Sequence, residues 1–161
     1  MFDPSRRSLF ARHRTPVSKR LPWVVAEPDF LERCSRCNHC VNACETNIIV
    51  HADGGYPQVD FSRGECTFCG ACAQACPEAL FADTNTAPWP NHISISQQCL
   101  AQQNIECRSC GDQCQPMAIQ FKLAVGAVAQ PQLQQDSCNG CGACIAGCPT
   151  AAISMISPQE N

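Results

Sequence analysis

Cysteine is the residue type with the most evident chemistry in this chain, which contains 16 Cys among 161 residues. Three runs share the spacing C-x2-C-x2-C-x3-C: Cys34, Cys37, Cys40, Cys44; Cys66, Cys69, Cys72, Cys76; and Cys138, Cys141, Cys144, Cys148. Thiolates at this spacing on a tight loop can bind three corners of an iron–sulfur cube, while the fourth Cys points toward another cube. The runs therefore predict [4Fe–4S] clusters.

A fourth run is irregular. Cys107, Cys110 and Cys114 keep the later spacing, but Asn104 stands where the first ligand is expected. Asn has no thiolate, and Cys99, five residues earlier, is the one Cys outside the runs. We predict that a longer loop brings Cys99 into the set; the alternative is a spare thiol beside a three-Cys cluster.

Zinc and disulfides are the other common uses of dense cysteines. Structural zinc sites typically contain pairs of ligands separated by a longer stretch. Disulfides need an oxidising compartment. The segment SRRSLF, with Arg6 and Arg7, resembles the start of a twin-arginine export signal, but ARHRTPVSKRLP after it contains no apolar segment of the required length. We therefore expect a cytoplasmic protein with no membrane span and with reduced, metal-binding cysteines.

The elements that must position these runs form a repeat. Two apolar segments with a glycine turn between them separate the first two runs and again the last two, which predicts β-hairpins at residues 48–59 and 118–133. The Pro-containing stretch between the second and third runs predicts an extended connector. We expect an α+β fold of two tandem dicluster ferredoxin modules, each pseudo-twofold with a short hairpin and small helices. The predicted divisions are a basic arm at 1–22, modules at 23–86 and 98–161, and a linker at 87–97.

In two-cluster ferredoxins the fourth Cys of each run binds the cluster of the other run. Applied to this chain, that rule predicts four clusters with these ligands: Cys34, Cys37, Cys40 and Cys76; Cys66, Cys69, Cys72 and Cys44; Cys99, Cys107, Cys110 and Cys148; and Cys138, Cys141, Cys144 and Cys114. Because the apolar content outside Cys is low, we expect the clusters to stabilise the fold.

The charges are unevenly distributed. Residues 1–20 hold six of the 11 Lys and Arg side chains and one of the 14 acidic ones. Each oxidised cluster with its thiolates adds a charge of about −2, so the loaded body is strongly acidic and should repel nucleic acid. We expect the arm either to dock on an acidic protein surface or to have no role; its main contacts would be Arg6, Arg7, Arg12 and Arg14.

The chain resembles the NapF family, the ferredoxin-type accessory proteins of periplasmic nitrate reductase. The motifs LPW before the first run, ECRSCGDQC and CNGCGACIAGCP carry the resemblance, which extends over nearly the whole chain. It implies a cytoplasmic protein that assists maturation of the catalytic subunit of the reductase before export, by delivering electrons or cluster components. The implied partner is the precursor of that subunit, with other electron-transfer proteins as further partners.

The alternative is a plain electron-transfer polyferredoxin of anaerobic respiration, and the sequence leaves both functions open. An enzyme is not expected, because the sequence has no nucleophile–base pair, phosphate loop or flavin site. Glu45 and Gln115 depart from the ferredoxin pattern beside the fourth Cys of their runs, which bears on local turn geometry.

Overall fold

The structure, a computed structural model, describes residues 20–156, so most of the expected basic arm lies outside the described residues. Short helices and short strands alternate along the chain, in agreement with the expected mixture of helix and strand. In order they are α1 (Glu27–Arg33), α2 (His39–Asn42), β1 (Ile49–His51), β2 (Pro57–Val59), α3 (Ala71–Gln74), β3 (His92–Ile95), α4 (Ser109–Asp112), β4 (Ile119–Ala124), β5 (Ala127–Leu133), α5 (Ala143–Ala146) and β6 (Ile153–Ile156). Single 3-10 turns lie at Asp53–Gly55 and Gln135–Ser137.

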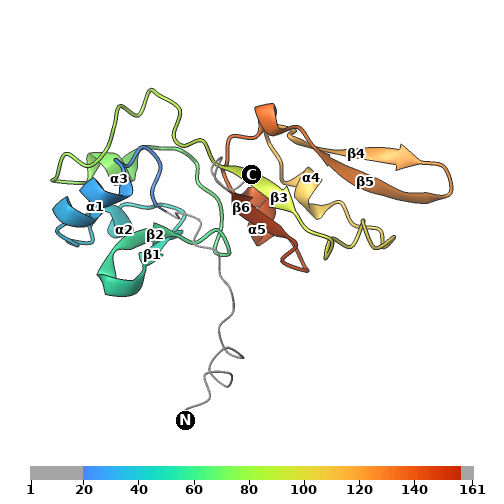
Figure 1. Cartoon of the computed structure of the whole chain (residues 1–161), viewed down its shortest axis with the longest axis horizontal. Coiled ribbons are helices and arrows are strands. Elements are labelled where there is room, and N and C mark those ends of the chain that lie inside the picture. The colour runs from blue at the N-terminus through green and yellow to red at the C-terminus, as the bar shows by residue number, and fades with distance from the viewer. Residues whose placement is uncertain (1–19, 157–161) are drawn as a thin grey trace, which may run out of the picture.

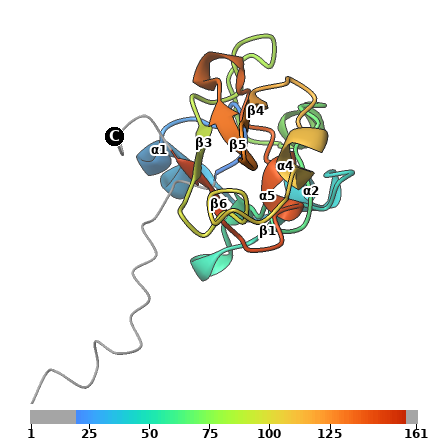
Figure 2. The ribbon, with the colours of Figure 1, turned by 90° about the vertical axis from the view of Figure 1, so that its right-hand side faces the viewer.

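The chain folds into two lobes (Figure 1). The first contains α1, α2, α3, β1 and β2, and the second contains β3 to β6 with α4 and α5. The β4–β5 hairpin projects away from the first lobe, and Figure 2 views the molecule from the side of this hairpin. Within the described residues, no helix has the length and apolar character needed to cross a membrane.

Three two-stranded antiparallel sheets are present in residues 20–156. Strands β1 and β2 pair with Ile49 opposite Val59, and β4 pairs with β5 with Ile119 opposite Leu133. Both pairs lie between Cys runs, in the segments where the sequence predicts hairpins. The third sheet joins β3 to β6, with Ile93 opposite Met155.

The β3–β6 pairing was not expected from the sequence, since residues 92–95 fall within the predicted linker. In the structure they form an edge of the second lobe. The physical reason is that side chains of a strand point alternately to its two faces, so that Ile93, Ile153 and Met155 are buried while Ser154 is exposed. Each strand has only four residues, too short for this alternation to stand out beside the prolines that precede β3.

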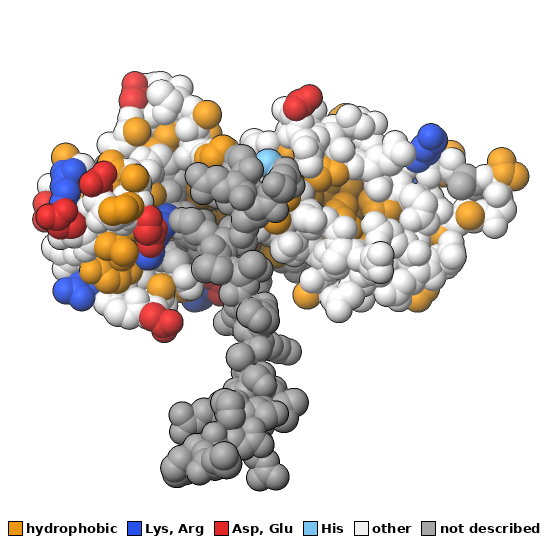
Figure 3. Space-filling view, in the orientation of Figure 1, with side chains coloured by type: hydrophobic (Ala, Val, Ile, Leu, Met, Phe, Trp, Pro, Cys, Tyr) orange, Lys and Arg blue, Asp and Glu red, His pale blue; other side chains and the backbone are white. Residues whose placement is uncertain are grey.

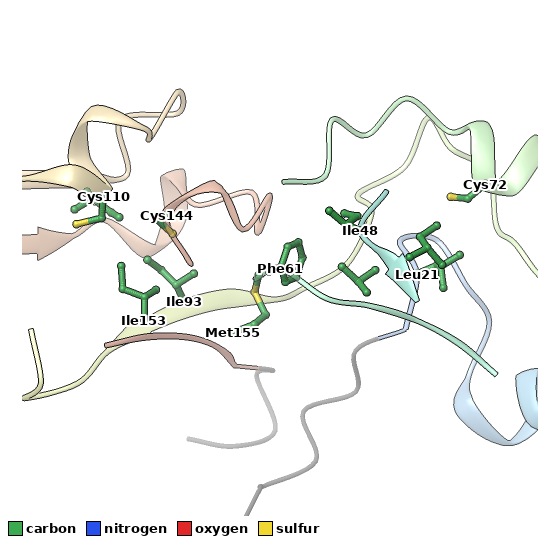
Figure 4. Packing of buried hydrophobic residues seen from close by; sticks show 12 residues of the cluster. Leu21, Ile48, Phe61, Cys72, Ile93, Cys110, Cys144, Ile153 and Met155 are labelled. Carbon is green, nitrogen blue, oxygen red and sulfur yellow. The ribbon is translucent and has the colours of Figure 1, made fainter. Parts of the chain in front are cut away.

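The two lobes share one apolar core. Leu21, Ile48, Val59 and Ile93 belong to it and are each no more than 2% exposed. Figure 4 shows Phe61 lying between the buried residues of the first lobe, such as Ile48, and those of the second, such as Met155. The lobes are therefore packed against each other and not merely tethered by the intervening segment.

The sequence predicts an arm up to residue 22, yet residues 20–22 pack on the first lobe. Leu21 is 2% exposed. The Arg20 guanidinium forms an ion pair with Glu27 at 2.6 Å, donates to the Pro57 carbonyl at 3.0 Å, and lies 4.8 Å from the centroid of the Phe30 ring. A bridge between Val24 and Phe81 then closes the lobe.

Candidate iron–sulfur sites

The first group of thiols, site A, lines one cavity of the first lobe. Its members come from the first two runs: Cys34, Cys37, Cys40 and Cys76. Leu21, Phe30 and Leu80 provide much of the remaining wall. Burial, together with the nearby Cys76, Cys34 and Cys37, raises the pKa of the Cys40 thiol to about 11. Without metal, therefore, the Cys40 thiol holds its proton tightly, because a thiolate there would lie in an apolar cavity beside other cysteines.

Site B lines a second cavity in the same lobe. Its thiols again come from both runs: Cys44, Cys66, Cys69 and Cys72. Trp23, Ile48 and Val59 are among the apolar side chains around it. Burial first, and then the nearby Cys66, raises the pKa of Cys72 to about 12. Cys72 lies on α3, which packs against α2, the helix that carries Cys40 of site A.

Site C occupies the corresponding position in the second lobe. The cavity is lined by thiols of the third and fourth runs: Cys114, Cys138, Cys141 and Cys144. Ile93 of β3 and Ile119 of β4 complete part of its wall, so the unexpected strand β3 helps to enclose a site. Burial, with Cys141 and Cys138 nearby, raises the pKa of Cys144 to about 12.

Site D is built around the irregular run. Burial, followed by the effects of Cys99 and Cys107, raises the pKa of Cys110 to about 11, so Cys99 and Cys107 are near enough to act on Cys110 electrostatically. The extra residues after Cys99 form a compact turn, in which the amide of Gln103 donates to the Cys99 carbonyl at 3.1 Å.

This turn is anchored on the second lobe. Ala101 is fully buried, and its carbonyl accepts a hydrogen bond of 2.6 Å from the side chain of Gln130 on β5. Asn104 adopts the left-handed backbone conformation at φ 61° and is exposed. The predicted fourth thiol of the site, Cys148, accepts a hydrogen bond from the amide of Ala152 at 3.2 Å. Its membership of site D stays a prediction.

These donor sets fit [4Fe–4S] clusters in chemical type, since each of the first three cavities offers four thiols in largely apolar surroundings. A cluster core would supply the positive charge that the crowded thiolates lack. Among the described residues, no three or more His, Cys, Asp or Glu side chains converge to hold a single metal ion.

Two threonines that the sequence analysis did not single out lie near thiols of the predicted ligand sets. Thr46 Oγ1 lies 3.5 Å from Cys44 Sγ, and Thr150 Oγ1 lies 3.8 Å from Cys148 Sγ. Burial raises the pKa of both thiols, but hydrogen bonds from these hydroxyls and from nearby amides outweigh it and lower the pKa below its ordinary value. The signal that could have found them is a Thr two residues after the fourth Cys of a run.

The surface charges differ between the lobes. Figure 3 shows Lys, Arg, Asp and Glu side chains gathered over the first lobe, with few on the visible face of the second. In residues 98–156 the charged side chains are Glu106, Arg108, Asp112, Lys122 and Asp136. The hairpin tip adds exposed Leu123 and Val125. Side chains therefore contribute little charge to this lobe.

Comparisons with known proteins agree with this chemistry. Residues 33–80 match a 4Fe-4S dicluster domain, and residues 131–154 match a 4Fe-4S binding domain. The ferredoxin-type protein NapF of Escherichia coli (strain K12) is 49% identical over 153 residues, covering 94% of this chain and 93% of the relative. NapF of Haemophilus influenzae is 50% identical over 145 residues, covering 90% and 82%.

A more distant similarity is to the methylamine utilization ferredoxin-type protein MauM of Methylophilus methylotrophus, which is 29% identical over 161 residues, covering 88% of this chain and 71% of the relative. The irregular third run, the thiol-lined cavities and the extent of the NapF matches together lead to one assignment. The chain belongs to the NapF family of ferredoxin-type iron–sulfur proteins.

Proposed function

We propose that the chain holds four [4Fe–4S] clusters, one at each of sites A to D, and acts in the cytoplasm as an accessory protein rather than as an enzyme. The main support for the proposal is that thiols from two different runs line one cavity, an arrangement found at sites A, B and C. For site D, the proposal assigns Cys99, Cys107, Cys110 and Cys148 as ligands. The effect of Cys99 on the pKa of Cys110 supports the inclusion of Cys99.

The proposed role is to assist maturation of the catalytic subunit of periplasmic nitrate reductase before that subunit is exported. Membership of the NapF family supports it, since the resemblance implies a cytoplasmic accessory protein of this reductase. The chemistry that the chain can offer is the delivery of electrons or of cluster components. The partner is then the cytoplasmic precursor of the catalytic subunit, which itself needs metal centres before export.

The cluster assignment is tested on protein isolated without air, for which we expect about 16 iron and about 16 sulfide per chain. Cys44→Ser and Cys66→Ser should perturb the same electron paramagnetic resonance (EPR) signal, and Cys76→Ser should behave like Cys34→Ser. Finding Cys44→Ser and Cys34→Ser to affect one common signal would show that each run binds its own cluster and would refute the cross-run ligand sets.

The maturation role is tested by immobilising the precursor of the catalytic subunit and adding either loaded chain or iron-free chain. An unrelated two-cluster ferredoxin of similar net charge is the control for nonspecific attraction. We expect only the loaded chain to bind. Isotopically labelled iron passing to the precursor would indicate delivery of cluster components, whereas reduction of the precursor without iron transfer would indicate delivery of electrons. If the loaded chain does not bind the precursor, the maturation role is wrong and a plain electron carrier remains.

A further inference from the structure

The two lobes meet where ligand loops of two different sites lie side by side. The amide of Cys66, in site B, donates to the carbonyl of Cys141, in site C, at 2.8 Å. The indole of Trp89 donates to the Asn139 carbonyl at 3.3 Å. The backbones of the two ligand loops are thus in direct contact, although they belong to different lobes and are more than 70 residues apart in the chain. We call this contact the seam.

Aromatic rings fill the seam on the side of the first lobe. Trp89 packs edge to face against Phe61, with centroids 5.9 Å apart and planes at 80°, and against Phe68, also at 5.9 Å and at 75°. Phe68 lies inside the ligand loop of site B, between Cys66 and Cys69. Edge-to-face pairs at these separations are favourable, so the rings fix the orientation of the site B loop.

Glycines leave room for these rings on the side of the second lobe. A Cβ at Gly140 would lie 2.6 Å from the Asn91 carbonyl oxygen, and a Cβ at Gly142 would overlap the ring of Phe61. Both glycines have positive φ, at 73° and 81°. The corresponding glycine of the first lobe, Gly70, has the same backbone conformation at φ 73°, but its nearest neighbour, Thr84 Cγ2, is at an ordinary 3.6 Å. The close fit is therefore a property of the seam and not of the ligand loop.

Within each lobe, short helices bring the two sites together. Helices α2 and α3 pack against each other and carry Cys40 of site A and Cys72 of site B. Helices α4 and α5 also pack together and carry Cys110 of site D and Cys144 of site C. Since the seam joins site B to site C, the sites follow one another in space as A, B, C and D. Along the chain, by contrast, the run that starts site D precedes the run that starts site C.

We propose that the seam formed by Phe61, Trp89 and the glycines at 140 and 142 joins the two lobes into one four-site electron relay, with sites B and C as its middle pair. The inference rests on the proposed occupancy of all four sites. Each step moves one electron from a reduced cluster to its oxidised neighbour, and no bond is formed or broken. A one-electron redox protein at site A or site D supplies the electron, and another at the opposite end accepts it.

The relay gives the seam residues a positioning role, because electron transfer slows steeply as two clusters move apart. The test uses the loaded full-length chain, reduced with dithionite, and measures the magnetic interaction between neighbouring reduced clusters by EPR spectroscopy. Gly142→Ala introduces a methyl group into the seam, and Gly70→Ala is its matched control with equal backbone strain at the same position of a ligand loop. Trp89→Ala is a second seam variant, in which the substituted residue lies outside the ligand loops and contacts them through Phe68 and Asn139.

We expect wild type and Gly70→Ala to show the interaction across the seam, and Gly142→Ala and Trp89→Ala to lose it while keeping about 16 iron per chain. Interactions within each lobe should persist and serve as an internal reference. If Gly142→Ala loses iron, the magnetic interaction across the seam is judged from Trp89→Ala alone. Spectra of the fully loaded seam variants that match wild type would overturn the relay. Iron well below 16 in the wild-type chain would instead contradict the four-cluster proposal.

Discussion

Replacing Thr46 by Val is the most direct single-residue test of how this chain sets the reduction potential of a cluster. The substitution keeps the shape of the side chain and removes the hydroxyl that lies 3.5 Å from Cys44 Sγ. When Cys44 is a cluster ligand its sulfur has no proton, so the hydroxyl is the donor. Reduction adds negative charge to the cluster and its sulfurs, and a donated hydrogen bond stabilises that charge. Thr46→Val should therefore lower the reduction potential of site B.

The size of the effect follows from the strength of one such bond. A hydrogen bond to a charged group contributes about 1.5–3 kcal/mol. The added electron is spread over the whole cluster, so only about a third of that, roughly 0.5–1 kcal/mol, should distinguish the reduced from the oxidised state. Since about 1.4 kcal/mol corresponds to about 59 mV for one electron, the expected shift is about −20 to −40 mV. Thr150→Val, at the longer distance of 3.8 Å, should give a smaller shift.

The measurement is a redox titration of the loaded protein followed by EPR spectroscopy. Thr46→Ser, which keeps a hydroxyl, should stay near wild type. Thr67→Val is the matched control, because Thr67 also lies beside site B but its hydroxyl donates to Glu45 at 2.7 Å and not to a thiol. An unchanged or raised potential in Thr46→Val, with Thr67→Val unchanged, would show that this hydroxyl does not stabilise the reduced cluster.

Three further outcomes are expected. Cys99→Ser should reduce the iron content from about 16 to about 12 per chain, whereas Asn104→Gly should retain it; equal iron contents would exclude Cys99 as a ligand. Trp23→Ala, at a residue only 6% exposed, should reduce the free energy of unfolding of the loaded protein by about 3–5 kcal/mol and its melting temperature by about 10 °C. Leu123→Ala, at a residue 76% exposed, should change both little. In the iron-free chain, burial raises the pKa of Cys72 from 9.0 to about 12, so the folded form binds its proton more tightly than the unfolded chain does. The contribution of this group to the stability of the iron-free folded chain should be complete below pH 9 and should be lost as the pH rises toward 12. Thermal melts at a series of pH values would measure the change, and a rise in stability over this range would contradict the prediction.

Cysteine spacing was the most informative part of the sequence. A loop whose cysteines stand at every third residue has few conformations that bring all three thiols to one cluster, so the spacing alone indicates the cluster type. Ligation at each site stays a prediction. The hairpins were also visible, since a glycine turn between apolar segments is a local signal. Strand β3 was not predicted, because its partner β6 lies about 60 residues away and the prolines before β3 suggested a linker.

The contacts that join the lobes were likewise beyond the sequence. Nothing local distinguishes Gly142 from Gly70, since both stand in the motif CGAC. Gly142 cannot be replaced by a residue with a side chain only because Phe61 approaches it from the other lobe. Thr46 and Thr150 do have a local signal, since each stands two residues after the fourth Cys of a run, but whether the hydroxyl reaches the thiol depends on how the chain turns after that Cys. Spacing predicts chemistry well, whereas contacts between distant segments require the fold.

The pairing of β3 with β6 has a consequence for how the protein is made. The bridge between Val24 and Phe81 closes the first lobe between residues that both emerge early from the ribosome. The second lobe is closed only when Ile153–Ile156 can pair with His92–Ile95. Until then Ile93, which lines the cavity of site C, has no partner strand. Because synthesis proceeds from the N-terminus, we expect iron to enter the proposed sites A and B while the chain is still growing, and to enter the proposed sites C and D only once β6 has been made.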